Sequence, residues 1–204
     1  MNKNTWEQFY KNTPLQNISW QKVQDDFLTE IINSGKVDTG SALDLGCGTG
    51  MKSIFLAKTG FDVTGVDISE TAIKYANENS KKEAIKINFI ASDATDLSFL
   101  GDEKFDLILD WANLHGILVQ KREQYIAEIA SHAKPGSNLI LRCFGRKDDE
   151  EQFVDNPAGI IALLTKQEID HLYGKYYEIL EQNISQAPDN APGKFFFELL
   201  MKRM

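Results

Sequence analysis

Three glycines, Gly46, Gly48 and Gly50, alternate with other residues directly after a strand-like run and before a helical pattern. Glycine has no Cβ, so it lets a ligand approach the backbone closely and allows dihedral angles that other residues avoid. Such a loop at the carboxyl end of a strand leaves room for a nucleoside. A glycine-rich turn can also be purely structural, and the three glycines alone leave both interpretations open.

Two acidic residues near this loop favour the ligand-binding interpretation. Asp44 stands two residues before Gly46, where its carboxylate can pair with the ammonium group of a ligand. Asp67 ends the next apolar run, where an acidic side chain can accept hydrogen bonds from ribose hydroxyls in a doubly wound sheet. Together the two acids suit a cationic amino-acid nucleoside.

The same spacing disfavours a dinucleotide. The dinucleotide fingerprint G-x-G-x-x-G has glycine at its sixth position, and counting from Gly46 this position is Met51. The third glycine stands one residue earlier, at Gly50. Hydride transfer with a nicotinamide cofactor is therefore disfavoured.

These motifs resemble those of the class I S-adenosylmethionine-dependent methyltransferases of the small-molecule type. The family's first motif has the form acidic-x-Gly-x-Gly-x-Gly and its second strand ends in an acid, and Asp44–Gly50 and Val63–Ser69 match both without a gap. Supporting matches are Ser92–Ala94, where the family places an acid and a small residue near the adenine, and Ala133–Ser137, the turn before the fifth strand. The resemblance covers residues 41–144, with weaker agreement through the terminal hairpin.

The resemblance implies S-adenosylmethionine as the cofactor. No Cys-x-x-Cys or histidine-rich spacing indicates a metal site. The expected cofactor-binding residues are Asp44, Gly46, Cys47, Gly48, Gly50, Asp67, Ile68, Asp93, Ala94 and Asp110.

The residues after the fourth predicted strand, Asp110 to Gly116, are candidates for the acceptor side, because ligands lie at the carboxyl ends of strands in such sheets. Asp110 can bond the donor's ammonium group or the region near its methyl group. His115 can act as a general base or polar contact, since its reference pKa of about 6.5 suits proton transfer at neutral pH. It can equally cap a helix or bond to the backbone. Trp111 and Asn113 are candidate substrate contacts.

Methyl transfer from a sulfonium is an in-line displacement whose leaving group is a neutral thioether. It needs no acid, and it needs a base only when the acceptor is a weak nucleophile. Because the sequence offers no compelling base, a soft acceptor such as a thiol is slightly favoured over a hydroxyl or an amine. Arg142 and Arg146 flank the end of the fifth strand and are expected to pair with the acidic run Asp148–Glu151 rather than with an anionic acceptor.

Residues 1–38 are expected to form an N-terminal helical segment ahead of a Rossmann-like core at 41–204. Its second helix is expected from Trp20 to Asn33. The aromatic side chains of this segment either close over the cofactor as a lid or pack a helix on the sheet. The candidates for the lid are Trp6, Tyr10 and Trp20.

Apolar runs of strand length alternate with helical patterns, which predicts an α/β fold with a doubly wound, mostly parallel sheet and helices on both faces. The expected strands are Ser41–Leu45, Asp62–Val66, Ile85–Ala91, Phe105–Asp110, Asn138–Phe144, Tyr177–Ile184 and Lys194–Lys202. The expected helices are Gly50–Lys58, Glu70–Lys82, Lys121–Ala133 and Thr165–Tyr173. The last two strands should form an antiparallel pair at one edge of the sheet. The family resemblance implies seven strands in the order 3-2-1-4-5-7-6, with strand 7 antiparallel.

The 204 residues, 42% of them hydrophobic, suffice for one good core, so a single domain is expected. The formal charge of −8 and the lack of a Lys/Arg block disfavour nucleic acid or an anionic membrane as a partner. No apolar run approaches the roughly 20 residues that span a bilayer, so a cytoplasmic protein is expected. Cys47 and Cys143 are expected as reduced, packed thiols.

The leading hypothesis is therefore methyl transfer from S-adenosylmethionine to a small molecule. A second hypothesis is a protein that binds S-adenosylmethionine or S-adenosylhomocysteine without transferring a methyl group, because an intact donor loop is expected in both. Methylation of a protein side chain is a third, disfavoured because no extra domain or peptide-binding strand is evident. Nucleic-acid methylation is disfavoured because Asp110–Asn113 lacks the family's Pro-Pro-aromatic tetrapeptide. The sequence makes no prediction of the oligomeric state.

Overall fold

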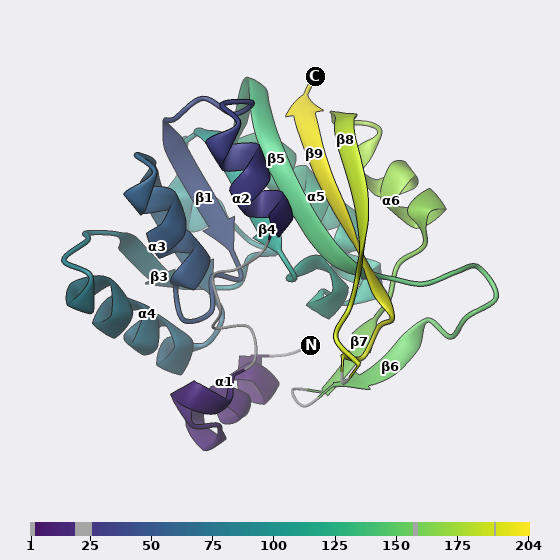
Figure 1. Ribbon diagram of the computed structural model, residues 1–204, viewed down its shortest axis with the longest axis horizontal. Helices are drawn as coiled ribbons and strands as arrows, with labels where there is room; N and C mark the ends of the chain where they lie inside the picture. The colour runs from purple at the N-terminus through teal and green to yellow at the C-terminus, as the bar shows by residue number, and fades with distance from the viewer. Residues whose placement is uncertain (1–2, 19–25, 157–158, 190) are drawn as a thin grey trace.

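The computed structural model describes residues 3–18, 26–156, 159–189 and 191–204. A seven-stranded sheet stands at its centre, with helices on both faces (Figure 1). Its strands are β1 Ser41–Leu45, β2 Asp62–Asp67, β3 Asn88–Ala91, β4 Phe105–Trp111, β5 Ala133–Gly145, β8 Tyr177–Gln186 and β9 Phe195–Arg203.

The strand order is β3-β2-β1-β4-β5-β9-β8, which is 3-2-1-4-5-7-6 when the strands of this sheet are counted along the chain. Strands β1 to β5 pair in parallel, and β9 is antiparallel to both of its neighbours. The predicted fold class and order are confirmed.

The central strands are apolar on both sides because helices cover both faces of the sheet. On one face α2 Asp26–Asn33 and α3 Met51–Lys58 enclose a buried cluster that includes Leu107 and Leu109. On the other face α5 Arg122–His132 and α6 Lys166–Tyr173 enclose a larger cluster. These two layers leave the carboxyl ends of β1, β2 and β4 as a shared edge.

Two further helices lie near that edge. α4 Glu70–Lys82 packs beside α3 and along β2 and β3, and α1 Lys3–Asn12 packs against α4 at the lower end of the molecule in Figure 1. Ser69 caps α4, because its hydroxyl accepts a hydrogen bond from the Ala72 N–H at 3.1 Å. The part of the predicted Trp20–Asn33 helix that precedes Asp26 lies outside the described residues.

The predicted strand Ile85–Ala91 is shorter in the structure and begins at Asn88. Ala84 has a left-handed φ of 55°, and the Ile85 N–H donates to the Ser80 carbonyl, which ends α4 rather than starting a strand. The capping box that opens α6 is present, with Thr165 accepting from the Glu168 N–H and Glu168 accepting from the Thr165 N–H.

The prediction missed a small two-stranded sheet formed by β6 Phe153–Asn156 and β7 Gly159–Ala162. Each strand has only four residues, and β6 comes directly after the charged run 146–151, so no long alternating pattern marks either strand. The Arg122 guanidinium donates to the Ala162 carbonyl at 2.6 Å and ties this hairpin to the start of α5.

Cys47 and Cys143 are free and buried, as predicted. Among the described residues, no helix has the length and apolar character needed to cross a membrane.

Candidate functional site

The glycine loop joins β1 to α3 in left-handed backbone conformations. The φ angles of Gly46, Gly48 and Gly50 are 69°, 55° and 80°. The N–H groups of Gly46 and Cys47 both donate to the Val66 carbonyl of β2, at 2.8 and 3.0 Å. Each of these glycines therefore has a conformation that a Cβ would disfavour.

Close packing adds a second constraint on the loop. A Cβ on Gly46 would lie 2.5 Å from Asn113 Oδ1, and a Cβ on Gly50 would lie 2.8 Å from the ring of Phe89. The loop is thus pressed against the segment after β4 on one side and against β3 on the other. No residue larger than glycine fits at these two positions without movement.

Asp67 closes the loop from the end of β2. One carboxylate oxygen accepts from the Gly48 N–H at 2.9 Å, and the other accepts from the Ser69 N–H at 2.9 Å. Asp44 lies at the end of β1 and accepts a hydrogen bond of 2.5 Å from the Ser53 hydroxyl on α3. Both carboxylates are buried.

Three buried aspartates meet at this edge, because β1 pairs with both β2 and β4. Burial raises the pKa of Asp44, Asp67 and Asp110 to about 6 each, against the lowering effect of their hydrogen bonds. Lys52 in the first turn of α3 also opposes the rise at Asp44. Burying three carboxylates is unfavourable without compensating positive charge. The three aspartates and the glycine loop therefore fit a cationic nucleoside such as S-adenosylmethionine.

The other expected cofactor residues surround the same edge. Asp93 follows β3 and accepts hydrogen bonds from the N–H and the hydroxyl of Thr95, at 2.9 and 2.8 Å. Ala94 is buried, and Ile68 is half-buried directly after β2. The thiol of Cys47 is buried, which raises its pKa well above the ordinary value.

The segment after β4 is held by Asp110. One oxygen of its carboxylate accepts from the N–H groups of Asn113 and Leu114, both at 3.1 Å, and the other accepts from the Tyr125 hydroxyl at 2.8 Å. These contacts turn both oxygens of Asp110 toward the protein. The predicted direct contact of Asp110 with the donor stays a prediction.

His115 is buried beneath this segment. Its Nδ1 accepts a hydrogen bond from the Phe144 N–H at 3.3 Å, and its ring lies 4.7 Å from that of Phe144. Burial, together with the positive charges of Arg122 and Arg142, lowers its pKa to about 3. The imidazole is neutral at physiological pH, with one nitrogen bound to the backbone. Its predicted role as a general base stays a prediction.

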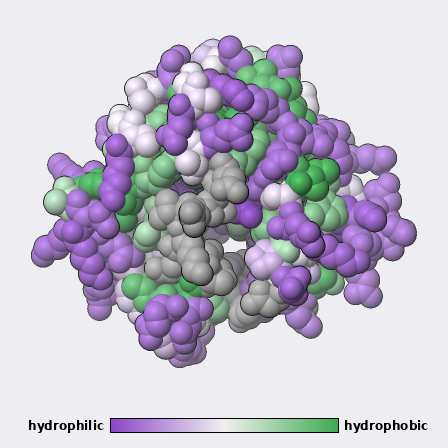
Figure 2. All heavy atoms as spheres, in the orientation of Figure 1, coloured by the Kyte–Doolittle hydropathy of each residue, from purple (hydrophilic) through white to green (hydrophobic). Residues whose placement is uncertain are grey.

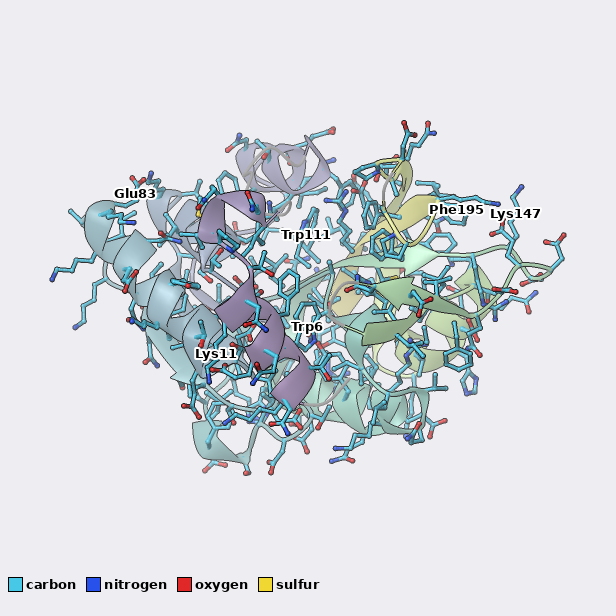
Figure 3. All side chains as sticks on the ribbon, turned by 90° about the horizontal axis from the view of Figure 1, so that it is seen from below. Trp6, Lys11, Glu83, Trp111, Lys147 and Phe195 are labelled. Carbon is cyan, nitrogen blue, oxygen red and sulfur yellow. The ribbon has the colours of Figure 1, made fainter. Side chains whose placement is uncertain are left out.

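An aromatic and cationic wall continues from the end of β4 across the sheet. The Arg142 guanidinium lies 5.1 Å from the Trp111 ring and 3.8 Å from the Phe196 ring. Its Nε lies 3.3 Å from Glu198, the residue directly opposite on β9, and Asn183 donates to Glu198 at 2.7 Å. Figure 3 views this end of the molecule and shows Trp111 near its middle.

The expected pairing of the two arginines with the acidic run is wrong. Arg142 faces β9 and pairs with Glu198, because cross-strand neighbours on one face of a sheet lie close together. Arg146 pairs with Glu168 of α6 at 3.2 Å and reaches only backbone carbonyls of the acidic run.

The helix α1 is anchored beside the donor loop through Glu7. Its carboxylate accepts from the Ser69 hydroxyl at 2.6 Å and from the N–H and hydroxyl of Thr71. Burial alone would raise the pKa of Glu7, but these hydrogen bonds and that of Lys11 lower it to about 2. Tyr10 is buried against Ile18 and Ala72.

Trp6 is half-buried beside Tyr10, and Figure 3 shows it on the inner side of α1 at the same end of the molecule as Trp111. Trp20 lies outside the described residues, so the structure places only two of the three predicted lid residues. The use of α1 as a lid stays a prediction.

Three residues of the site were not identified from the sequence. They are Ser53, Tyr125 and Glu7. Tyr125 lies on the buried face of α5, but the partners of its hydroxyl come from β4 and the segment after it. Only Ser53 had a usable signal, as a polar residue in the first turn after the glycine loop.

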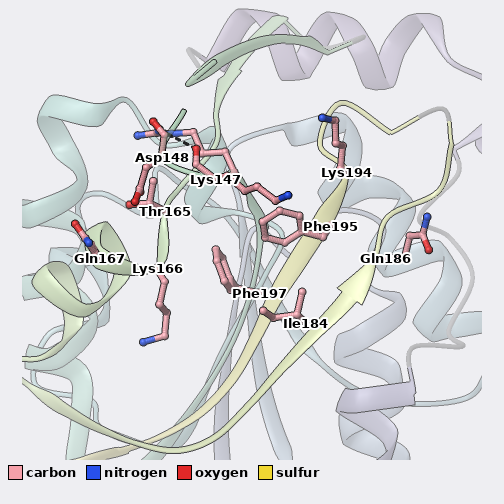
Figure 4. A pocket seen from close by; sticks show the side chains of 11 residues that line it. Lys147, Asp148, Thr165, Lys166, Gln167, Ile184, Gln186, Lys194, Phe195 and Phe197 are labelled. Atoms are coloured by element: carbon pink, nitrogen blue, oxygen red, sulfur yellow. Dashed lines mark hydrogen bonds between the residues drawn. The ribbon is translucent and has the colours of Figure 1, made fainter. Parts of the chain in front are cut away.

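A separate groove of about 650 Å³ lies on the α6 side, between the end of β5 and the β8–β9 pair (Figure 4). Its floor is formed by Ile184, Phe195 and Phe197. Most of its basic rim is already neutralised, since Arg146 pairs with Glu168, Lys166 with Asp170 and Lys194 with Glu150. None of the predicted site residues lines it.

Comparison with known proteins gives a consistent result. Residues 42–136 match the model of a methyltransferase domain. The chain is 30% identical over 174 residues to a 2-heptyl-1-hydroxyquinolin-4(1H)-one methyltransferase of Mycobacteroides abscessus, which covers 83% of this chain and 71% of the relative. It is 33% identical over 131 residues to a 2-methyl-6-phytyl-1,4-hydroquinone methyltransferase of Synechocystis, covering 62% of this chain and 40% of that one. A solved structure of an S-adenosylmethionine-dependent methyltransferase from Methanosarcina mazei superposes with a TM-score of 0.74 and 25% identity, covering 85% of this chain and 97% of that one.

Proposed function

Because this chain belongs to the S-adenosylmethionine-dependent methyltransferases, with S-adenosylmethionine as its cofactor, we propose that it methylates a small organic acceptor. The observation that carries the proposal is the meeting of three buried aspartates with a glycine loop at one sheet edge. The acceptor would bind between this loop, the segment Asp110–Gly116 and α1.

The proposed donor contacts follow from the geometry of the edge. Asp67 would hold the ribose hydroxyls while it keeps the Gly48 N–H in place, and Asp44 would neutralise the ammonium group. Asp93 and Ala94, with Ile68 and Cys47, would border the adenine, since they surround the ends of β1, β2 and β3. Asp110 would act on the donor through the segment that it holds, because its oxygens already accept three hydrogen bonds from the protein.

The chemistry places modest demands on the protein. When bound, S-adenosylmethionine supplies a methyl group whose bond to sulfur breaks as the acceptor's lone pair attacks the carbon, which leaves a neutral thioether. The residues of the chain need only orient the two molecules and exclude water. A neutral His115 with a pKa of about 3 is a weak base, so the proposal favours an acceptor whose lone pair is available at neutral pH, such as a thiol, an aryl amine or an acidic hydroxyl.

A ring-bearing acceptor is favoured over a small inorganic one. Two relatives are named for a hydroxyquinolinone and a hydroquinone, both of which carry rings. In this chain the wall at the end of β4 and β5 consists of Trp111, Arg142 and Phe196, and flat aromatic surfaces stack well on rings. These two observations support the ring class without selecting one compound.

Incubation with methyl-labelled S-adenosylmethionine and a panel of acceptors tests the proposal. The panel contains hydroxyquinolines, hydroquinones, catechols, aryl thiols and aryl amines, with selenite and tellurite as inorganic controls. The expected result is label in at least one ring-bearing compound, found by scintillation counting and mass spectrometry.

Three other outcomes would contradict the proposal. Cofactor binding without turnover of any compound would favour a protein that binds the cofactor without transferase activity. Transfer only to an inorganic oxyanion would overturn the ring class. Label incorporated only into acid-precipitated protein from a cell extract would favour a protein substrate.

A further inference from the structure

The turn that follows β4 is strained and tightly held. Ala112 has a φ of 70°, in the left-handed region that residues with a Cβ rarely adopt. Its N–H donates to the Arg142 carbonyl at 2.8 Å, and Asp110 accepts the N–H groups of Asn113 and Leu114. The turn therefore keeps an unfavourable conformation because contacts on both sides fix it.

Tyr125 joins the two ends of this turn from α5. Its hydroxyl donates to the second carboxylate oxygen of Asp110 at 2.8 Å and accepts from Asn113 Nδ2 at 3.0 Å. The three side chains form one directional chain of hydrogen bonds, in which the amide donates to the phenol and the phenol donates to the carboxylate. A hydrogen bond to a carboxylate is stronger than one between neutral groups.

This chain of bonds fixes which way the Asn113 amide points. Because the amide nitrogen faces the Tyr125 hydroxyl, the amide oxygen faces the glycine loop, where it would lie 2.5 Å from a Cβ on Gly46. The glycine loop thus rests on a side chain whose orientation is set by a residue on another element.

We propose that Tyr125 is a positioning residue for the donor site, which holds the Asp110–Asn113 turn and the Asn113 amide against Gly46 and so sets the position of the cofactor loop. The inference rests on the proposed function, because it assigns a role at the same site. Tyr125 acts through Asn113 and Asp110 and has no role in the reaction itself.

Tyr173 provides a matched control within the same buried cluster. It lies on α6, is as fully buried as Tyr125, and packs in the same core, but its hydroxyl has no hydrogen-bond partner in the described part of the chain. Tyr173→Phe removes one buried oxygen atom, as Tyr125→Phe does, but it breaks no hydrogen bond with the turn after β4.

The experiment is calorimetric titration of the full chain with S-adenosylhomocysteine, for wild type, Tyr125→Phe and Tyr173→Phe. Loss of a charge-assisted hydrogen bond predicts a dissociation constant about tenfold higher for Tyr125→Phe, and a change of less than about twofold for Tyr173→Phe. The stoichiometry should stay that of wild type. A residue needed only for folding would lower the stoichiometry and leave the dissociation constant unchanged.

Asn113→Ala removes the other end of the chain of bonds without touching α5. It should weaken binding by a similar factor, and the double variant with Tyr125→Phe should weaken it by less than the product of the two factors, because both changes break one network. Multiplicative effects would overturn the inference.

The failures of the two proposals are distinguishable. If wild type does not bind S-adenosylhomocysteine, the proposed function fails and this inference falls with it. If wild type binds while Tyr125→Phe stays within about twofold of it, or Tyr173→Phe weakens binding equally, only the role of Tyr125 is overturned.

Discussion

The donor side and the acceptor side of the site are built in different ways. Most of the donor side comes from one stretch of chain, from Asp44 at the end of β1 to Ser69 after β2, and its contacts are mostly with backbone groups. The acceptor side draws on β4, β5, β9, α5 and the β6–β7 hairpin, and its contacts join a side chain of one element to a group on another element. The contacts of the donor side therefore form mostly within a short stretch of sequence, whereas those of the acceptor side form only when distant elements pack together.

The two sides also differ in charge. Asp44 and Asp67 make the donor side acidic, and the third buried aspartate, Asp110 of β4, stands where the two sides meet. Arg122 and Arg142 lie on the acceptor side, where both depress the pKa of His115. This separation suits a positively charged donor and an electron-rich acceptor. On the exterior, Figure 2 shows a mainly hydrophilic face with separate apolar patches.

The largest expected effect is on the donor side, with Gly46→Ala. The new Cβ would lie 2.5 Å from Asn113 Oδ1 on a backbone with a φ of 69°, so the affinity for S-adenosylhomocysteine should fall by about 100-fold or more. Gly35→Ala is the control, because Gly35 has a φ of 72° but no atom within 4 Å of its added Cβ. It should cost about 1 kcal/mol of stability and leave affinity unchanged. Calorimetry measures the affinity of each variant for S-adenosylhomocysteine, and thermal unfolding measures its stability. Near-normal affinity for Gly46→Ala would contradict the close packing of the loop.

The pH dependence of cofactor binding should be the next largest effect. A carboxylate with a pKa of about 6 takes up a proton as the pH falls, and the neutral acid no longer attracts a cation. Between about pH 7.5 and about pH 5.5, the affinity for S-adenosylmethionine should fall by roughly fourfold for each aspartate that must ionise. 5′-Methylthioadenosine carries neither positive charge and should show a smaller dependence in the same titration. Constant affinity for S-adenosylmethionine would mean that the three carboxyls do not neutralise it.

Glu7→Gln tests whether α1 belongs to the donor side. Ser69 and Thr71 lose a charged acceptor, which should lower the stability by about 1–2 kcal/mol and weaken cofactor binding by about threefold. Glu70→Gln is the control, because Glu70 forms an exposed pair with Lys3 that solvent screens. If Glu7→Gln and Glu70→Gln changed the cofactor affinity equally, α1 would not belong to the donor side.

The smallest effect is expected at His115. His115→Asn keeps an acceptor near the position of Nδ1 for the Phe144 N–H, so kcat with an accepted substrate should fall by less than about fivefold, whereas removal of a general base costs about 100-fold or more. A loss of that larger size, with the acid limb of the pH profile abolished, would establish His115 as the base.

The same contrast explains what the sequence could and could not predict. The strands and the donor loop follow from patterns within short stretches, because apolar runs and the spacing of Gly46, Gly48 and Gly50 are local. The strand order was predicted from the family resemblance, since no local pattern determines which strands pair. The partners of Arg142 and Arg146 depend on which strands and helices face them, so the expected pairing with the neighbouring acidic run was wrong.

The hydrogen bonds of His115 and Tyr125 were equally out of reach. Each of these hydrogen bonds joins groups on different elements, and no local sequence pattern around His115 or Tyr125 indicates which group is its partner. The hairpin β6–β7 was missed because four-residue strands carry too few alternating positions to stand out from a charged loop.

The most direct test of the central claim is calorimetric titration of S-adenosylmethionine into wild type, Asp67→Asn and Asp62→Asn. Asp67 accepts hydrogen bonds from the N–H groups of Gly48 and Ser69 and would bind the ribose. Asp62 is exposed at the opposite end of the same strand, β2. We predict that wild type binds S-adenosylmethionine, that Asp67→Asn binds it with an affinity at least about tenfold lower, and that Asp62→Asn binds it with wild-type affinity. Unchanged affinity for Asp67→Asn would contradict the placement of the cofactor at this edge.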